Sequence, residues 1–520
     1  MHTPELSTTL VPELPKLAWL ATLDLPTMRL EVLHGEAVEI GDDWIVEGVW
    51  DGEFAEGEFH RTEHFFGSGI RIDGEAVHFV PSCALVDRLL YAEEEERLTI
   101  SNSLPLILAR LGAELDPAHD YRHEAEAIKR GIRDYPREFR VQHPRLSSIV
   151  QLFHNRLVVT RDRVEMVPAP ESPRLESFDH YRELLRGVLG RMRDNYTAPE
   201  RAHRVSAFTT ISSGYDSPAV TALTCEIGVR ESFTSHRSRS VVPALISRRA
   251  AIDDGSEIAR VLGVQVHRLD THRSRMSEDE MYFAAPSAEE PELVFHSMAR
   301  HIEERCEVAG VFTGYNGGMV WDVDLRSTYL SDQIKRKDTA GLSLSEIRLK
   351  SGFINAPIPF LFARRVPDLV EISRDPEMEP WRLHKAYDRP IPRRILEEAG
   401  VPRQVFGMRK KAVVQAYNYP IHPGLRQRFF RHLRERFGWS PAFVYAYDRA
   451  NRWVYPLALA TKVVRERVDG RKRRMRRINL WREVDLAYQM HLCALESLRE
   501  RMAAVLREQD QRQRALQPAP

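Results

Sequence analysis

From about residue 203 the sequence alternates between short strand-like runs and helical runs, and this rhythm constrains the fold more than any other feature. The runs RVSAFTTI, ESFTSHRS, VQVHRL and GVFTG have strand composition, and SPAVTALTCEIG and DDGSEIARVLG lie between them. Alternation of this kind predicts a parallel sheet with helices on both faces. Because ligands of such sheets bind at the carboxyl ends of the strands, we expect functional residues in the loops there.

Residues 1–172 have a different pattern. The runs WIVEGVWDGEFAEGEF, GIRIDGEAVHFVP and RLVVTRDRVEMVP are short, alternating and broken by Asp-Gly and Gly turns. They predict an antiparallel, layered β domain. After the Pro-rich break PAPESPR (168–174), a helix is expected whose apolar stripe is Tyr181, Leu184, Leu185, Val188 and Met192.

Beyond roughly residue 420 the chain is expected to be mainly helical and Arg-rich. A last long helix is expected over 480–507, followed by a frayed tail, QDQRQRALQPAP. We therefore expect three domains, 1–172, 173–420 and 421–520. The basic run RERVDGRKRRMRR (465–477) is a candidate site for a polyanion such as RNA, an acidic lipid surface or an anionic glycan, but a solvated or interface-paired stretch is the more common case.

The bulk charge and the cysteines limit the classes of protein. Lys plus Arg and Asp plus Glu number 75 each, so no overall field attracts nucleic acid or a membrane, and we do not expect nucleic acid as a partner. The four cysteines lie far apart without a C-x-x-C pair, which indicates a reducing compartment. No secretory signal or membrane span is expected, so a cytoplasmic protein is predicted.

The stretch TTISSGYDSPAV (209–220) carries the strongest chemical signal. It predicts a strand that ends in small residues and then a helix N-terminus, where backbone N–H groups converge on an anion. Gly214 allows positive φ or a close backbone approach, and Ser212, Ser213 and Ser217 supply hydroxyl groups. Asp216 is a candidate ligand for a divalent cation that bridges phosphate oxygens.

A simpler interpretation treats Asp216 or Ser217 as an ordinary helix N-cap that binds nothing. The chain has no G-x-x-x-x-G-K-[ST] sequence, so a Walker-type site is excluded.

SSGYDS (212–217) resembles S-G-G-x-D-S, the pyrophosphate loop of the ATP pyrophosphatase (PP-loop) superfamily. Three further segments resemble the synthetase domain of the glutamine-hydrolysing asparagine synthetase family in order and spacing. They are DDGSEIARVLGVQVHRLD (253–270), GVFTGYNGGMVWD (310–322) and YDRPIPRRILEEAGVPRQVFGMRKKAVV (387–414). A weaker resemblance extends into the first domain.

The resemblance implies an ATP- and Mg²⁺-dependent ligase that adenylates a carboxylate, releases pyrophosphate and forms an amide with an amine or ammonia. It implies an adenine nucleotide α-hydrolase-like domain after a degenerate Ntn-hydrolase-like glutaminase domain. ATP would contact residues 212–217 and Gly314, with Tyr215 included. Lys411 and Arg409 would neutralise the departing pyrophosphate, or would belong to a solvated helix end. Tyr387 is a candidate acid/base group or a packed core tyrosine.

The sequence departs from the family at the glutaminase nucleophile. The family uses an N-terminal cysteine, whereas this chain starts Met1-His2 and its first cysteine is Cys83, so glutamine hydrolysis is not expected. In this respect the first domain resembles the inactive glutaminase domains of β-lactam synthetases and lasso-peptide cyclases, which keep the synthetase chemistry but use another amine.

The synthetase half also departs from the family pattern. Gly318 stands at the metal-binding aspartate of the second loop, so that Asp322 or Asp324 takes over or one metal is lost. Asn355 and Pro357 stand where asparagine synthetases have Glu and Arg, so free asparagine is not the expected product.

Two other functions stay open: a nucleotide-binding pseudoenzyme or scaffold, and an RNA-modifying PP-loop enzyme that uses the basic C-terminal region. The expected partners of the ligase are a small-molecule or peptide carboxylate and an amine donor, and a homodimer is left open.

Overall fold

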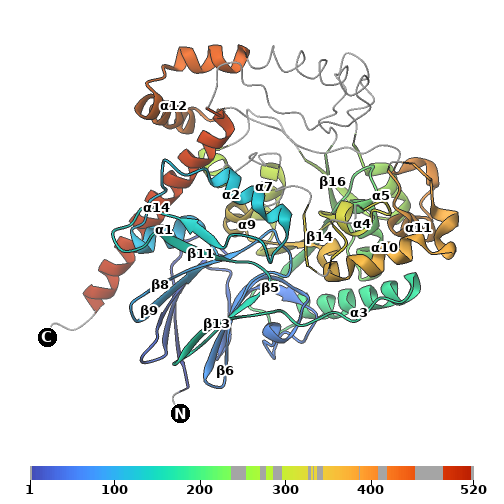
Figure 1. Cartoon of the computed structure of the whole chain (residues 1–520), viewed down its shortest axis with the longest axis horizontal. Coiled ribbons are helices and arrows are strands. Elements are labelled where there is room, and N and C mark those ends of the chain that lie inside the picture. The colour runs from blue at the N-terminus through green and yellow to red at the C-terminus, as the bar shows by residue number, and fades with distance from the viewer. Residues whose placement is uncertain are drawn as a thin grey trace.

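The computed structural model describes residues 3–235, 253–269, 277–284, 295–325, 329–331, 333–336, 344–385, 387–407, 419–450 and 484–516. An N-terminal half built from two sheets lies beside a half built around one smaller sheet, and the last helix of the chain lies against the first half (Figure 1).

The N-terminal half is a sandwich of antiparallel sheets, as predicted. The seven-stranded sheet has the order β1-β3-β2-β9-β8-β11-β10, with bounds β1 Glu5–Leu10, β2 Trp19–Asp24, β3 Arg29–His34, β8 Leu89–Glu94, β9 Arg97–Ser101, β10 Glu138–Arg140 and β11 Ser148–Leu152. The six-stranded sheet has the order β13-β12-β7-β6-β5-β4, with bounds β4 Glu39–Ile40, β5 Trp44–Trp50, β6 Phe65–Asp73, β7 Ala76–Val80, β12 Arg156–Thr160 and β13 Arg163–Val167. The β1–β3 pair is parallel, which the sequence pattern did not predict.

Apolar side chains from both sheets meet between them because successive residues of a strand face opposite sides. Trp19, Leu30 and Ile100 come from one sheet, and Ile70 and Phe79 come from the other. This half also contains four short helices: η1 (Phe59–Arg61), α1 (Leu104–Leu111), α2 (Tyr121–Glu126) and η2 (Ala127–Arg130).

The helix predicted after the Pro-rich break is α3 (Phe178–Tyr196). The Ser177 hydroxyl accepts a hydrogen bond from the His180 N–H at 3.1 Å and caps it. Of the predicted stripe only Leu184 is partly exposed; the other four residues are buried.

The second half contains the predicted parallel sheet. Its order is β16-β15-β14-β17-β18, with bounds β14 Val205–Thr210, β15 Glu231–Ser235, β16 Gln265–Leu269, β17 Val308–Thr313 and β18 Phe353–Pro357, and every pair is parallel. All five strands therefore end at the same edge of the sheet.

Helices cover both faces of this sheet. Thr209 of β14 faces α4 (Asp216–Glu226), where the Thr209 and Thr221 hydroxyl groups are 3.2 Å apart. Its neighbour Phe208 faces α7 (His296–Arg305), with ring centroids of Phe208 and His301 6.0 Å apart. Because adjacent strand residues point to opposite faces, α4 and α7 lie on opposite sides. The remaining elements of this half are α5 (Ser256–Leu262), α6 (Glu278–Ala284), α8 (Gly317–Val320), α9 (Ser345–Ser351), η7 (Ile358–Phe360), η8 (Ala363–Arg365), α10 (Val366–Arg374), η9 (Pro376–Trp381), α11 (Pro390–Glu398) and η10 (Arg403–Val405).

The C-terminal region is helical where it is described, with α12 (Pro423–Phe437) and α14 (Leu486–Leu516). The frayed tail predicted from residue 509 is wrong for 509–516, because α14 continues to Leu516, and residues 517–520 lie outside the described residues. Arg512 forms ion pairs with Glu13 and Glu508, and Gln509 is buried, so neighbours of the helix hold its last turns. Among all the residues that the structure describes, no helix is both long enough and apolar enough to cross a membrane.

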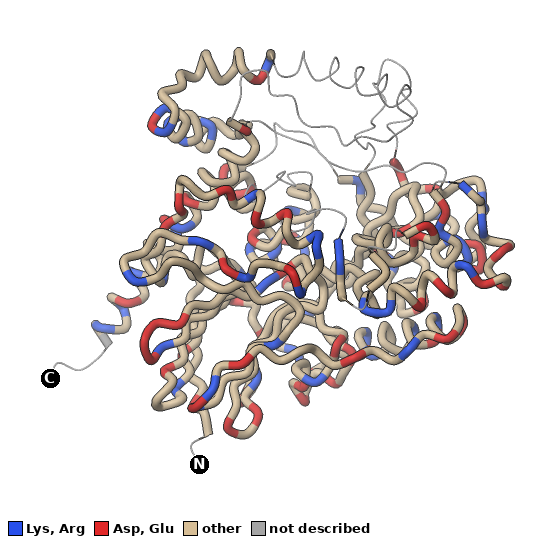
Figure 2. The backbone as a smooth tube through the Cα atoms, viewed as in Figure 1, with Lys and Arg blue, Asp and Glu red and all other residues tan. Residues whose placement is uncertain are grey.

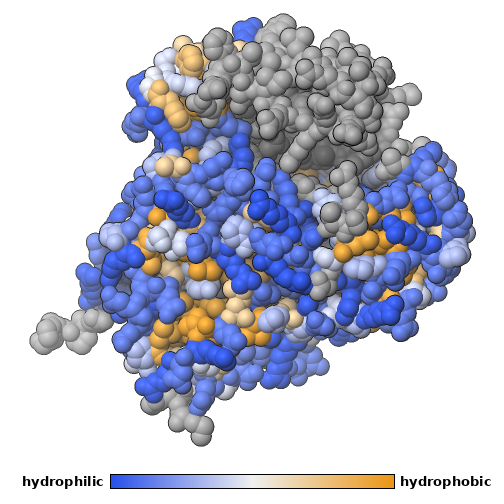
Figure 3. All heavy atoms as spheres, in the orientation of Figure 1, coloured by the Kyte–Doolittle hydropathy of each residue, from blue (hydrophilic) through white to orange (hydrophobic). Residues whose placement is uncertain are grey.

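Charges of both signs are interspersed along the backbone (Figure 2), as the equal totals of basic and acidic residues imply. The face drawn in Figure 3 is mainly hydrophilic, with separate apolar patches over each half. The three-domain division stays a prediction, and the basic run 465–477 lies outside the described residues.

Candidate functional site

The serine loop (residues 211–217) joins β14 to α4 at the carboxyl edge of the parallel sheet. The neighbouring strand β15 holds the start of this loop. The Ile211 N–H donates to the Phe233 carbonyl oxygen at 2.9 Å, and the Thr234 hydroxyl donates to the Ile211 carbonyl oxygen at 2.8 Å. The loop thus stands where parallel-sheet proteins bind ligands.

Hydrogen bonds inside the serine loop set its shape. The hydroxyl oxygens of Ser212 and Ser217 are 2.9 Å apart, and the Gly214 N–H donates to Ser212 Oγ at 3.2 Å. The N–H and hydroxyl of Ser213 both donate to Oδ1 of the buried Asp253, at 3.1 and 2.8 Å. Asp253 therefore orients the loop, while the Asp254 carboxylate accepts from the Ser256 N–H at 2.9 Å at the start of α5.

The simple N-cap interpretation does not describe this helix start. The N-cap residue is Tyr215, which makes no side-chain capping bond, and the Asp216 carboxylate contacts the Arg389 guanidinium instead. Gly214 does not have positive φ, so of the two alternatives expected for this glycine the close approach is the one observed. A Cβ at Gly214 would lie 3.3 Å from Ser212 Oγ, which makes this a tight approach.

The turn after β17 approaches the serine loop so closely that glycines are required. A Cβ at Gly314 would lie 2.3 Å from the Ser217 nitrogen, and one at Gly317 would lie 2.6 Å from Asp216 Cγ. A Cβ at Gly318 would lie 2.7 Å from Arg389 Nη2. The absence of a side chain at Gly314 therefore lets the turn after β17 contact the serine loop.

The segment 387–407 packs over the same loop. Arg393 is buried between the rings of Tyr215 and Phe406, with its Cζ 5.1 Å from each ring centroid, and it donates to the Tyr215 hydroxyl. The Gly407 N–H donates to the Ser213 carbonyl oxygen at 3.0 Å. The Tyr215 side chain is itself fully buried, so it anchors the serine loop.

Tyr387 lies beside the serine loop and packs on Tyr215 with ring centroids 4.8 Å apart. Burial, followed by the nearby Asp216 charge, raises the pKa of the Tyr387 phenol above its ordinary value. Tyr387 is therefore neutral at physiological pH and can donate a hydrogen bond, but it is a poor base.

The Asp216 carboxylate, the predicted Mg²⁺ ligand, has both oxygens in contact with Arg389 Nη1. Gly318 adds no carboxylate, and Asp322 lies close enough to Arg389 to help raise the pKa of that guanidinium against the effect of burial. Asp324 is exposed. This arrangement does not fit a divalent ion held by Asp216, and a metal there stays a prediction.

Three buried polar atoms near this edge have no hydrogen-bond partner among the described residues. They are the Thr313 hydroxyl oxygen at the end of β17, Nδ2 of Asn316 in the next turn, and Nε of Arg389. Buried donors are rarely left unpaired without a reason, and a bound ligand is one reason. The three donors fit the oxygens of an anion such as a nucleotide phosphate.

Arg409 and Lys411 lie outside the described residues, which end at Gly407 on this side. Asn355 lies near the end of β18 and is buried, and Pro357 is the last residue of that strand. In the N-terminal half, Cys83 is buried and this burial raises the pKa of its thiol, so it offers no thiolate nucleophile.

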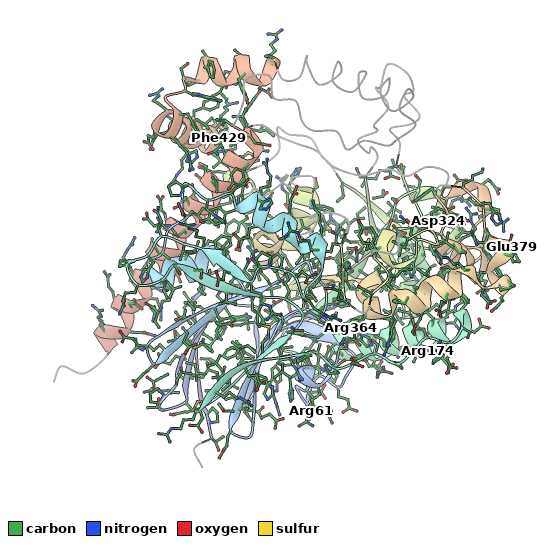
Figure 4. All side chains as sticks on the ribbon, viewed as in Figure 1. Arg61, Arg174, Asp324, Arg364, Glu379 and Phe429 are labelled. Atoms are coloured by element: carbon green, nitrogen blue, oxygen red, sulfur yellow. The ribbon has the colours of Figure 1, made fainter. Side chains whose placement is uncertain are left out.

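The described residues contain one group of three metal-ligating side chains, His60, Asp73 and His78. Arg61 donates to both His60 and Asp73, so a cation already neutralises the one carboxylate. Figure 4 labels Arg61 in the N-terminal half and Asp324 in the other half, so this group is remote from the serine loop.

Sequence reasoning missed Arg389 and Arg393, which tie α11 to the serine loop. Their spacing of four residues in the run RPIPRRIL, which also contains Arg394, is a signal for one shared helix face. It could not reveal which carboxylate or ring they contact.

In comparisons with known proteins, no protein family and no curated protein matched the chain.

Proposed function

We propose that the chain is an ATP-dependent carbon–nitrogen ligase that forms AMP and pyrophosphate. One observation carries the proposal: a serine-rich loop lies between a parallel strand and a helix N-terminus, beside three unpartnered buried donors. Such an edge is suited to the pyrophosphate part of a nucleotide. The resemblance of residues 212–217 to the PP-loop sequence supports ATP as that nucleotide, and with it an adenine nucleotide α-hydrolase-like sheet.

The proposed reaction has two steps. A carboxylate oxygen attacks the α-phosphorus of ATP, an O–P bond forms, and the bond to the β-phosphate oxygen breaks with release of pyrophosphate. The amine nitrogen then attacks the acyl carbon, a C–N bond forms, AMP leaves with the electrons of the C–O bond, and the amine proton passes to solvent. The first step needs stabilisation of the charge that develops on pyrophosphate.

Each residue near the serine loop has a role in this proposal. The N-terminus of α4, which begins at Asp216, and the Arg389 guanidinium face the pyrophosphate, and Asp253 keeps the loop in shape. Lys411 and Arg409 follow Gly407 by four and two residues, and the bond from Gly407 to Ser213 supports their assignment to the phosphates. Tyr387 would donate a hydrogen bond.

The N-terminal half would be a degenerate, Ntn-hydrolase-like glutaminase domain. The buried, protonated Cys83 supports a supply of amine from another source than glutamine. All four cysteines are free, which supports a reducing cytoplasm as the site of action.

The test is a screen of carboxylic acids and amines with ATP and Mg²⁺, measuring AMP and pyrophosphate. The ligase predicts equal amounts of both products with some acid, and loss of both in Asp253→Ala. Formation of ADP and phosphate, or no nucleotide product with a broad panel, would contradict it.

A nucleotide-binding pseudoenzyme is the alternative that one observation favours, because Arg389 engages the carboxylate proposed for the metal. It predicts ATP binding without pyrophosphate release. An RNA-modifying enzyme would instead show salt-sensitive RNA binding that depends on Arg473 and Arg474.

A further inference from the structure

Arg389 has a fixed position at the serine loop. Its side chain is only 3% exposed, its Cζ lies 4.9 Å from the ring centroid of Tyr387, and its Nη1 contacts both carboxylate oxygens of Asp216. It stands at the N-cap of α11, so a rigid element sets where the side chain starts. A guanidinium stays charged at every physiological pH, and once buried it needs such an anionic partner.

The turn after β17 makes room for this pair. A Cβ at Gly317 would lie 2.6 Å from Asp216 Cγ, and one at Gly318 would lie 2.7 Å from Arg389 Nη2. Neither glycine has positive φ, so close approach and not backbone conformation explains both. A carboxylate at position 318 and the guanidinium of Arg389 would therefore compete for the same space.

One donor of Arg389 remains available. Its Nε is buried and has no hydrogen-bond partner among the described residues, although Nη1 is engaged by Asp216. A buried, charged group with a spare donor beside an anion-binding loop is arranged for a ligand oxygen.

We propose that Arg389 is a built-in cation that takes the position a divalent ion would take at Asp216, and that Gly318 is the residue that makes this substitution possible. Asp216 is then a positioning residue that holds Arg389 toward the phosphates. The inference rests on the proposed function for the identity of the anion. Any metal ion would arrive with the nucleotide and would not occupy Asp216 beforehand.

The test is a titration with Mn²⁺ without nucleotide, in which electron paramagnetic resonance measures the free ion. Wild type should take up no stoichiometric Mn²⁺, whereas the double variant G318D/R389A, which has room for a second carboxylate beside Asp216, should take up one equivalent. Lys350→Ala removes a cation paired with Glu303 at 2.7 Å and is the matched control, which should behave as wild type. One equivalent bound to wild type and lost in Asp216→Asn would overturn the inference.

A second measurement applies if the double variant does not fold. Asp216→Asn should lower the melting temperature of wild type by several degrees, since it leaves Arg389 buried without its anion, but should have little effect in an R389M background. Equal effects in both backgrounds would also overturn the inference. No arm uses ATP, so failure of ATP binding would contradict the proposed function and leave these results interpretable.

Discussion

At the residue scale, the serine loop depends on the absence of one side chain. Gly314 lies against the first turn of α4, where a methyl group would come within 2.3 Å of the Ser217 nitrogen and 2.4 Å of the Asp216 carbonyl carbon. Backbone atoms cannot move aside as a flexible side chain can. Gly314→Ala should therefore lower the free energy of unfolding by about 1–3 kcal/mol, as overpacking does.

Gly310 in β17, four residues before Gly314, is the control for this variant. The nearest atom to its Cβ position is Val205 Cγ1 at 3.7 Å, so Gly310→Ala should leave stability near that of wild type. Urea unfolding of both variants measures the difference. Equal losses in the two variants would show that the close contact of Gly314 with α4 does not explain the loss of stability in Gly314→Ala.

Glu346 makes stability depend on pH. Its carboxylate accepts from the Ser103 hydroxyl at 2.9 Å and the Leu104 N–H at 3.2 Å, yet burial dominates and raises its pKa from 4.5 to about 7. The contribution of protonated Glu346 to the free energy of unfolding is complete below pH 4.5 and is lost as pH rises through about 7. Between these two pH values the free energy of unfolding of wild type should fall by up to about 3 kcal/mol relative to that of Glu346→Gln. Chemical unfolding from pH 4.5 to 8 tests this, and parallel curves would contradict it.

The serine loop itself could be predicted from sequence because its residues are contiguous and each type has a local reason to be there. Arg389 could not be assigned, because its partner Asp216 is 173 residues away in the sequence. For Gly214 the sequence left positive φ and a close approach as alternatives, and the structure shows the close approach, since a Cβ there would lie 3.3 Å from Ser212 Oγ.

At the element scale, α9 joins the two halves of the molecule. Arg348 on this helix donates to Glu47 of β5 at 2.6 Å and to Asp87 before β8 at 3.1 Å, and all three side chains are buried. Removing the cation leaves two buried carboxylates without compensation. Arg348→Ala should therefore destabilise the protein by about 3–5 kcal/mol.

The matched control for Arg348 is Lys350, two residues along the same helix. Its ion pair with Glu303 is partly exposed, so Lys350→Ala should cost at most about 1 kcal/mol. Thermal and urea unfolding give both values. A small effect of Arg348→Ala would show that the two halves do not depend on this buried contact.

The elements most accessible to prediction were those with a strong local pattern. The hairpins β6–β7 and β12–β13, helix α3 and the strands β14 to β17 follow alternation or helical spacing that is visible in the sequence. The last turns of α14 were missed because the sequence there is polar. Contacts with Glu13 and Arg110, from the other end of the chain, hold them.

At the scale of the whole molecule, the C-terminal helix returns to the N-terminal half. Helix α14 runs along α1, where Leu492 and Leu495 join the core that contains Ile107 and Phe139 (Figure 1). The sequence predicted a long C-terminal helix but not the surface that it covers, since an apolar helix face can pack on many different surfaces.

This packing predicts that the two halves and α14 unfold together. Leu495 is 1% exposed, so Leu495→Ala should cost about 2–5 kcal/mol and should shift the whole transition. Calorimetry and circular dichroism would report this shift. A separate early transition that alone moves in the variant would show that α14 docks as an independent unit.

The most direct test of the central claim is a calorimetric titration of wild type and Gly214→Ala with ATP and Mg²⁺. A methyl group at Gly214 would lie 3.3 Å from Ser212 Oγ and 3.8 Å from the Tyr387 hydroxyl oxygen, so the fold should tolerate it while space above the serine loop is filled. Wild type should bind one ATP, and the variant should bind it at least about tenfold more weakly, a loss of about 1.4 kcal/mol. No uptake by wild type, or equal affinity of both proteins, would contradict a nucleotide site at this loop.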